Sequence, residues 1–247
     1  MRYFVTVILF FLNAHCLAQL PVHDTFDGEQ LSLLWDTSRF EKGAVIMQSN
    51  VVHTGIRAAK ITLHQGDKYE AGNDSSLASE RAELLEAKKL VSREHKTYEY
   101  AFSMFIPADF PIVPTRLVIA QWKQHCTTQQ CEDDSPVLAL RYTNGKLQIT
   151  IQTGAHREVY YQTNSDIRNK WITFKFTVNF SRDNDGFIKG WINDTQVLDY
   201  KGKSAYGAER GYALNSYFYF KMGLYRDRMV EPMTIYIDDY SKTQLPN

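Results

Sequence analysis

Residues 217–226 of the 247-residue chain read Tyr-Phe-Tyr-Phe-Lys-Met-Gly-Leu-Tyr-Arg, and this stretch is a clear indication of the fold class. Successive side chains of a β-strand point to opposite faces of the sheet, so the stretch divides into two rows. We expect the apolar row to face a core: Phe218, Phe220, Met222 and Leu224. We expect the polar row to form an accessible face: Tyr217, Tyr219, Lys221, Gly223 and Tyr225.

The polar row has two interpretations. Ordinary strand tyrosines and a lysine that extends into solvent would explain it without any function. Alternatively it is a binding face, because Lys221 and Tyr225 point the same way about 13 Å apart along the strand. Gly223 between them carries no side chain, which would let a ligand lie flat on the sheet.

Most of the remaining sequence has the pattern of short β-strands. Tyr, Phe, Thr and Val favour strands, and Asn144-Gly145 is a strong hairpin signal between residues 137–142 and 146–152. We predict further strands at residues 33–39, 44–52, 58–63, 97–106, 117–123, 171–179, 187–193 and 234–240. Residues 79–90 have a helix-like composition, but we predict a strand because tertiary context often overrides propensity. The pattern predicts an all-β fold, a two-sheet β-sandwich of the concanavalin-like jelly-roll type.

The N-terminus has the features of an export signal. Arg2 precedes an apolar run at residues 4–12, and Cys16-Leu17-Ala18 forms a small-residue cleavage site before Gln19. Cys16 would also allow a lipoprotein, although His15 before it fits that processing poorly. The run is too short to span a membrane, and no later segment is long enough. We expect a signal peptide at residues 1–18 and a single jelly-roll domain at residues 19–247, secreted or periplasmic.

Charge and cysteine content narrow the classes of partner. Removing Arg2 leaves 28 − 1 = 27 basic residues against 28 acidic ones, a net charge of −1. A bulk basic field is absent, so we expect no nucleic-acid partner and no membrane association after signal removal. We also expect a monomer. Cys126 and Cys131 are expected to form a small loop disulfide in an oxidising compartment. Their spacing does not suit a zinc site.

Three predicted strands carry polar residues where a core strand would be apolar. They are residues 79–84, residues 119–123 and the 217–226 strand. If these strands are neighbours, their polar side chains converge on one concave face: Arg81, Gln121, Lys123, Lys221 and Tyr225. Without a site, Arg81 with Glu80 or Glu83 would be a cross-strand ion pair, and Gln121 would satisfy backbone groups.

The order of these motifs resembles the jelly-roll polysaccharide lyases. The carrying segments are residues 79–84 (Ser-Glu-Arg-Ala-Glu-Leu), 121–123 (Gln-Trp-Lys) and 219–225 (Tyr-Phe-Lys-Met-Gly-Leu-Tyr). The sequence is most similar to the heparin lyase I and glucuronan lyase group, and more distantly to alginate lyases. The similarity covers residues 24–240, including the Asn-Gly hairpin and Trp191-Ile192-Asn193.

The resemblance implies β-elimination of a uronate-containing anionic polysaccharide without an organic cofactor. By position, Arg81 and Gln121 would neutralise the uronate carboxylate, and Tyr225 would protonate the leaving glycosidic oxygen. Neutralisation matters because the C5 proton becomes acidic only when the developing enolate is stabilised. A base and an acid must then act on the two sides of the bond. We expect four further residues to bind substrate: Lys221, Arg141, Tyr219 and His125.

Lys123 is a departure, because heparin and alginate lyases usually have Gln-x-His at this motif. Lysine titrates near 10.4 unless its surroundings change that. Lys123 would therefore either be a neutral base, depressed by Arg81 and Lys221, or stay charged and help to neutralise the carboxylate. In the second arrangement, which we favour, Tyr225 serves as base and acid. His125 could substitute as the base, or catalysis could be lost.

Loss of catalysis defines the rival hypothesis, a non-catalytic carbohydrate-binding jelly-roll protein. A retaining glycosidase is a weaker rival, because it needs two carboxylates about 5–5.5 Å apart. Acidic residues near both ends of the chain also suggest a structural calcium at Asp24 and Asp239, as in some relatives, with Asp27 and Asp238 nearby. Solvated turn carboxylates would explain those acids equally well.

Overall fold

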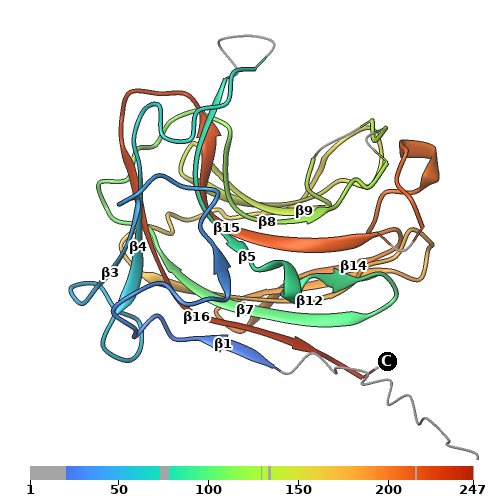
Figure 1. Cartoon of the computed structure of the whole chain (residues 1–247), viewed down its shortest axis with the longest axis horizontal. Coiled ribbons are helices and arrows are strands. Elements are labelled where there is room, and N and C mark those ends of the chain that lie inside the picture. The colour runs from blue at the N-terminus through green and yellow to red at the C-terminus, as the bar shows by residue number, and fades with distance from the viewer. Residues whose placement is uncertain (1–20, 73–77, 129, 133–134, 215, 247) are drawn as a thin grey trace, which may run out of the picture.

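Two antiparallel β-sheets packed face to face make up the protein in the computed structural model (Figure 1). The structure describes residues 21–72, 78–128, 130–132, 135–214 and 216–246. The two packed sheets confirm the predicted all-β sandwich of jelly-roll type. The expected signal peptide at residues 1–18 lies outside the described residues. Among the described residues, no helix has the length and apolar character that a membrane span requires.

The first sheet forms the outer layer in the order β14-β13-β12-β7-β16-β4-β3, with β1 also paired to β16. Its strands run over Val22–Asp24 (β1), Val45–Gln48 (β3), Ala58–Leu63 (β4), Thr97–Phe105 (β7), Trp171–Asn179 (β12), Phe187–Ile192 (β13), Thr195–Lys201 (β14) and Met233–Gln244 (β16).

The second sheet carries the concave face in the order β11-β10-β9-β8-β15-β5-β2, with β6 also paired to β15. Its strands run over Trp35–Asp36 (β2), Ser79–Glu86 (β5), Ser92–Arg93 (β6), Leu117–Gln124 (β8), Leu138–Thr143 (β9), Lys146–Ile151 (β10), Glu158–Gln162 (β11) and Tyr217–Asp227 (β15). Strand β15 lies between β8 and β5, so the three motif-bearing strands are neighbours.

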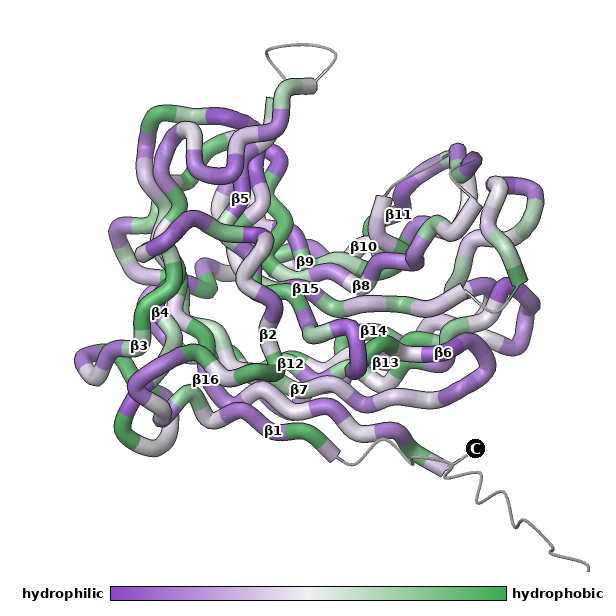
Figure 2. Tube along the Cα trace, in the orientation of Figure 1, coloured by the Kyte–Doolittle hydropathy of each residue, from purple (hydrophilic) through white to green (hydrophobic). Residues whose placement is uncertain are grey.

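The core forms where the inner rows of the two sheets meet. The apolar row of β15 is completely buried, as predicted: Phe218, Phe220, Met222 and Leu224. Phe220 packs against Phe102 of β7, with ring centroids 5.5 Å apart. The ring centroids of Trp122 of β8 and Phe176 of β12 are 4.9 Å apart. Hydropathy alternates along these strands in Figure 2, as expected when each strand has one face in the core.

Several local predictions can now be compared with the structure. Residues 79–86 form a strand as predicted, but Lys88–Leu90 is a short 3-10 helix (η2). A second 3-10 helix, η3, covers Ala208–Arg210. The predicted hairpin joins β9 to β10, with Asn144 and Gly145 both at positive φ. The predicted disulfide between Cys126 and Cys131 is present.

Gly223 has a different role from the one its position suggests. Its φ of 140° suits glycine, and the pairing of β15 with β8 shifts register between Met222 and Tyr225. A Cβ at this position would overlap the carbonyl oxygen of Ala82 and lie 2.8 Å from the Cα of Glu83. The missing side chain therefore makes room for the backbone of β5, not for a ligand.

Replacing Gly223 with alanine should lower the free energy of unfolding by about 1–3 kcal/mol, the range for a strained backbone conformation. Equilibrium urea unfolding measures this loss. Gly154→Ala is the matched control, because a Cβ there would have no atom within 4 Å. Equal stability of the two variants would show that β5 moves aside at no cost.

Candidate functional site

A polar pocket opens on the concave sheet around Tyr225, and we call it the Tyr225 pocket. It contains the five residues predicted to converge, together with Arg141. The full lining is Glu70, Arg81, Arg116, Val118, Gln121, Lys123, Ser135, Pro136, Arg141, Arg157, Lys221 and Tyr225. Six of these described side chains are cationic and one is a carboxylate, so the pocket suits an anionic ligand.

A buried carboxylate, Glu83, holds the floor of this pocket together. Glu83 is 1% exposed and accepts hydrogen bonds from Lys221 (3.1 Å), Arg81 (3.4 Å) and the Gln121 amide. It comes from β5, whereas Lys221 and Gln121 come from β15 and β8. One carboxylate thus fixes groups from three strands and offsets the repulsion between Arg81 and Lys221.

The sequence interpretation underestimated Glu83, because it considered this residue only as a cross-strand ion-pair partner of Arg81. The available signal was that Glu83 shares a strand face with Arg81. Arg116 and Arg157 were missed as well. Arg116 immediately precedes β8, and Arg157 immediately precedes β11, a strand that the sequence did not predict.

Tyr225 lies between two guanidinium groups. The Cζ atoms of Arg81 and Arg116 are 4.3 Å and 4.5 Å from the centroid of its ring. Arg116 also forms an ion pair with Asp227 at 2.7 Å. These contacts fix the ring through cation–π interactions and place positive charge beside the phenol.

Arg81 is anchored on two sides but keeps one donor for a ligand. It pairs with Glu70 at 2.5 Å as well as with Glu83, and its side chain is 9% exposed. Its Nε is buried and finds no hydrogen-bond acceptor within the described part of the chain. A buried donor without an acceptor is costly, so this atom is well suited to an anionic oxygen.

Lys221 has the most strongly perturbed amine of the pocket. It is 4% exposed, and burial lowers its pKa to about 8, with Glu83 opposing the shift and Arg81 and Lys123 adding to it. Its Nζ lies 5.9 Å from the centroid of the Tyr225 ring. Burial likewise lowers the pKa of Arg141 to about 10, with Arg157 and Arg116 contributing.

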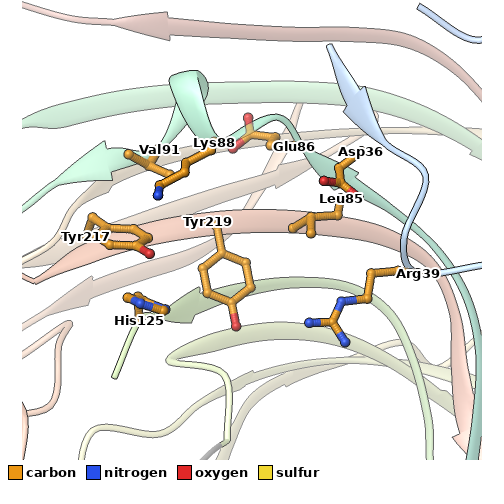
Figure 3. Close-up of a pocket in the computed structure, with 9 residues that line it drawn as sticks. All are labelled: Asp36, Arg39, Leu85, Glu86, Lys88, Val91, His125, Tyr217 and Tyr219. Carbon is orange, nitrogen blue, oxygen red and sulfur yellow. The ribbon is translucent and has the colours of Figure 1, made fainter. Parts of the chain in front are cut away.

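Two residues predicted to bind substrate lie elsewhere on the same face. Tyr219 and His125 line a neighbouring pocket with Tyr217, which we call the Tyr217 pocket (Figure 3). Because His125 is not part of the Tyr225 pocket, the structure does not place it as a base beside Tyr225. Burial lowers the pKa of His125, and Lys88 and Lys123 lower it further.

A structural calcium at Asp24 and Asp239 stays a prediction, and a cation would need their oxygens to converge on one point. Asp24 accepts hydrogen bonds from Ser32 and from the indole of Trp35, whereas Asp239 accepts from His53 and Thr54. The described residues contain no group of three or more His, Cys, Asp or Glu side chains arranged to hold a metal ion.

Several solved structures share this fold. The endo-β-1,4-glucuronan lyase of the fungus Trichoderma reesei is 16% identical, with a TM-score of 0.67 over 92% of this chain and 96% of that one. The alginate lyase AlgAT5 from polysaccharide lyase family 7 is 17% identical, with a TM-score of 0.56 over 83% and 84%. A GH131 β-glucanase catalytic domain from Podospora anserina is 10% identical, with a TM-score of 0.60 over 92% and 93%.

These similarities show the fold alone. The same fold also occurs in a β-glucanase, so the fold by itself does not identify the reaction. A search of curated protein sequences finds no match. The family model described as polysaccharide lyase, however, matches residues 24–241. That range includes every lining residue of the Tyr225 pocket and all strands of both sheets except the start of β1 and the end of β16. The chain therefore belongs to the polysaccharide lyase family.

Proposed function

We propose that this lyase is exported and cleaves a uronic-acid-containing polysaccharide, of glucuronan, heparin or alginate type, by β-elimination in the Tyr225 pocket. The observation that carries the proposal is the phenol of Tyr225 set among cations, with Arg81 and Arg116 beside its ring. Glucuronan and alginate lyases share the fold. The N-terminal sequence pattern and the Cys126–Cys131 disulfide support export.

In the first step, the pocket neutralises the uronate carboxylate. The Nε of Arg81, the Lys123 amine and the Arg141 guanidinium supply positive charge and donors, with Gln121 held beside them by Glu83. Stabilising charge that develops on the carboxylate during enolate formation lowers the barrier to losing the C5 proton. Because Glu70 already anchors Arg81 and Glu83 anchors Lys221, these two cations need little reorganisation when substrate binds.

In the second step, Tyr225 acts on both sides of the bond that breaks. Its deprotonated oxygen takes the C5 proton, and the electrons of the C5–H bond form the C4–C5 double bond. The glycosidic C4–O bond then breaks, and the leaving oxygen receives the proton from Tyr225. In this scheme Lys123 stays charged and binds the carboxylate, so its replacement of the usual histidine is compatible with catalysis.

Incubation with a panel of uronate polysaccharides tests the proposal. A rise in ultraviolet absorbance from the unsaturated uronate, with one substrate of the panel, is the expected result. Binding of a uronate polysaccharide with no absorbance change on any panel member would instead favour a carbohydrate-binding protein. Hydrolysis products without the double bond would indicate a glycosidase.

The pKa of Lys221, about 8, predicts how substrate affinity changes with pH. A lysine is charged below its pKa and neutral above it, so raising the pH from about 7 to about 9 removes one positive charge beside Glu83. We expect affinity for an oligouronate to fall by about tenfold over this range. Isothermal titration calorimetry on Tyr225→Phe protein, which should not consume the ligand, measures the change.

Lys221→Met in the same background is the comparison for this pH effect. It should bind more weakly at neutral pH and lose the transition near pH 8. An unchanged transition in the Lys221→Met protein would assign the pH effect to another group of the pocket.

A further inference from the structure

We infer that the Tyr217 pocket binds a second uronate ring of the same polysaccharide, apart from the ring that reacts at Tyr225. The inference rests on the proposed function. The lining of this pocket is Asp36, Arg39, Leu85, Glu86, Lys88, Val91, His125, Tyr217 and Tyr219. Of these residues, Tyr219 and His125 were expected from the sequence to bind substrate, and Tyr217 belongs to the polar row that was considered as a binding face.

Strand β15 contributes lining residues to both pockets. Tyr217, Tyr219, Lys221 and Tyr225 all lie on the polar row of β15, and Lys221 and Tyr225 line the Tyr225 pocket. The eight-residue step from Tyr217 to Tyr225 corresponds to about 26 Å along an extended strand. A polysaccharide chain that follows β15 would therefore place different sugar rings at the two pockets.

The aromatic groups of the Tyr217 pocket are a stacked pair of rings and a third ring edge-on to it, and an outer ring face of the stack suits a pyranose ring. The rings of His125 and Tyr217 stack with centroids 4.3 Å apart and an interplanar angle of 22°. Tyr219 meets His125 edge-on at 6.5 Å. Figure 3 shows the Tyr217 ring stacked on the His125 ring, with Tyr219 extending beside the pair. With its lowered pKa, His125 is uncharged at neutral pH and contributes an apolar face.

The charged groups favour an anionic sugar over a neutral one. Lys88 is exposed on η2, and the Arg39 side chain is 45% exposed, with a 4.0 Å contact to Glu70 and an electrostatic interaction with Asp36. Of the two acids in the lining, Glu86 is buried and already paired with Lys242 at 3.1 Å. Asp36 accepts a hydrogen bond from the backbone of Ser38 at 2.7 Å. Two accessible cations thus face a single accessible carboxylate.

The test measures kcat/KM on oligosaccharides of increasing length prepared from whichever uronate polysaccharide is cleaved. For the native protein, kcat/KM should rise when the chain becomes long enough to reach the Tyr217 pocket. Lys88→Ala and Arg39→Ala should each remove about tenfold of that rise, the size of one charge-assisted hydrogen bond, and leave the shortest substrates unaffected. Lys88→Glu should remove more than Lys88→Ala.

Lys89→Ala is the matched control, because Lys89 is exposed on the same turn but does not line the pocket. It should behave as the native protein. If Lys88→Ala and Lys89→Ala have the same effect, or if the loss is equal at every substrate length, the second uronate site does not exist. The absence of cleavage of any uronate polymer by the native protein would overturn the proposed function itself, a result distinct from length-independent cleavage. Thermal melting of each variant verifies folding.

Discussion

Tyr225→Phe protein is expected to lose turnover of the cleaved polysaccharide by about 10²–10⁴-fold, the typical contribution of a positioned acid or base. The substitution removes one hydroxyl group and keeps the ring that Arg81 and Arg116 contact at 4.3 Å and 4.5 Å. The pocket should therefore keep its shape and its affinity for the anionic chain. The loss should appear in kcat, measured from the initial rise in ultraviolet absorbance, with KM changed little.

Tyr160→Phe is the matched control for this experiment. Tyr160 is 40% exposed on β11 and does not line the Tyr225 pocket. Its replacement should leave kcat unchanged. If Tyr225→Phe protein kept more than a tenth of the native kcat, another group would have to supply the proton, and Lys221 and Lys123 would be the next residues to test.

Lys242→Met is expected to lower the free energy of unfolding by about 3–5 kcal/mol, because it leaves a buried carboxylate without its counter-ion. Lys242 and Glu86 are each 2% exposed and form an ion pair at 3.1 Å. The Lys242 amine also donates to the carbonyl of Leu90. Burial lowers the pKa of Lys242, and the Glu86 carboxylate opposes that shift by stabilising the charged amine.

A second variant separates lost charge compensation from lost packing. In Lys242→Met/Glu86→Gln protein, the neutral amide can still accept the hydrogen bond that the Tyr240 hydroxyl now donates to Glu86. Most of the stability should return, as measured by equilibrium urea unfolding. Lys201→Met, at an exposed position on β14, should stay within about 0.5 kcal/mol of the native protein. Failure of the double variant to recover would mean that the packing of the lysine side chain dominates.

Much of the fold could be predicted from the sequence because the central strands alternate strongly. The 217–226 stretch has an unbroken apolar row, and all four of those side chains are fully buried. Strands β11 and β14 were missed because exposed strands need no such row. In β11, Val159 and Tyr160 are 53% and 40% exposed. A strand at the edge of a sheet can therefore form without the alternation that identifies it.

The main residues of the site could be predicted from the sequence, but the ion pairs that link them could not. Arg81, Gln121, Lys123, Lys221 and Tyr225 meet in one pocket because their strands are neighbours. The pairing of Glu83 with Lys221 joins residues 138 positions apart, and no local pattern in the sequence encodes that distance. Glu86 presented the same difficulty, since its partner Lys242 is 156 positions away.

The two-sided character of β15 also constrains how this enzyme could diversify. Inserting or deleting one residue in this strand would exchange its rows, turning Phe220 toward the substrate and Lys221 into the core. Natural variation in β15 should therefore consist of substitutions at constant length. Segments at the margins of the concave sheet, such as β11 and the Cys126–Cys131 loop, have no such constraint. Differences in substrate preference among descendants of this protein should accordingly arise from length changes at those margins.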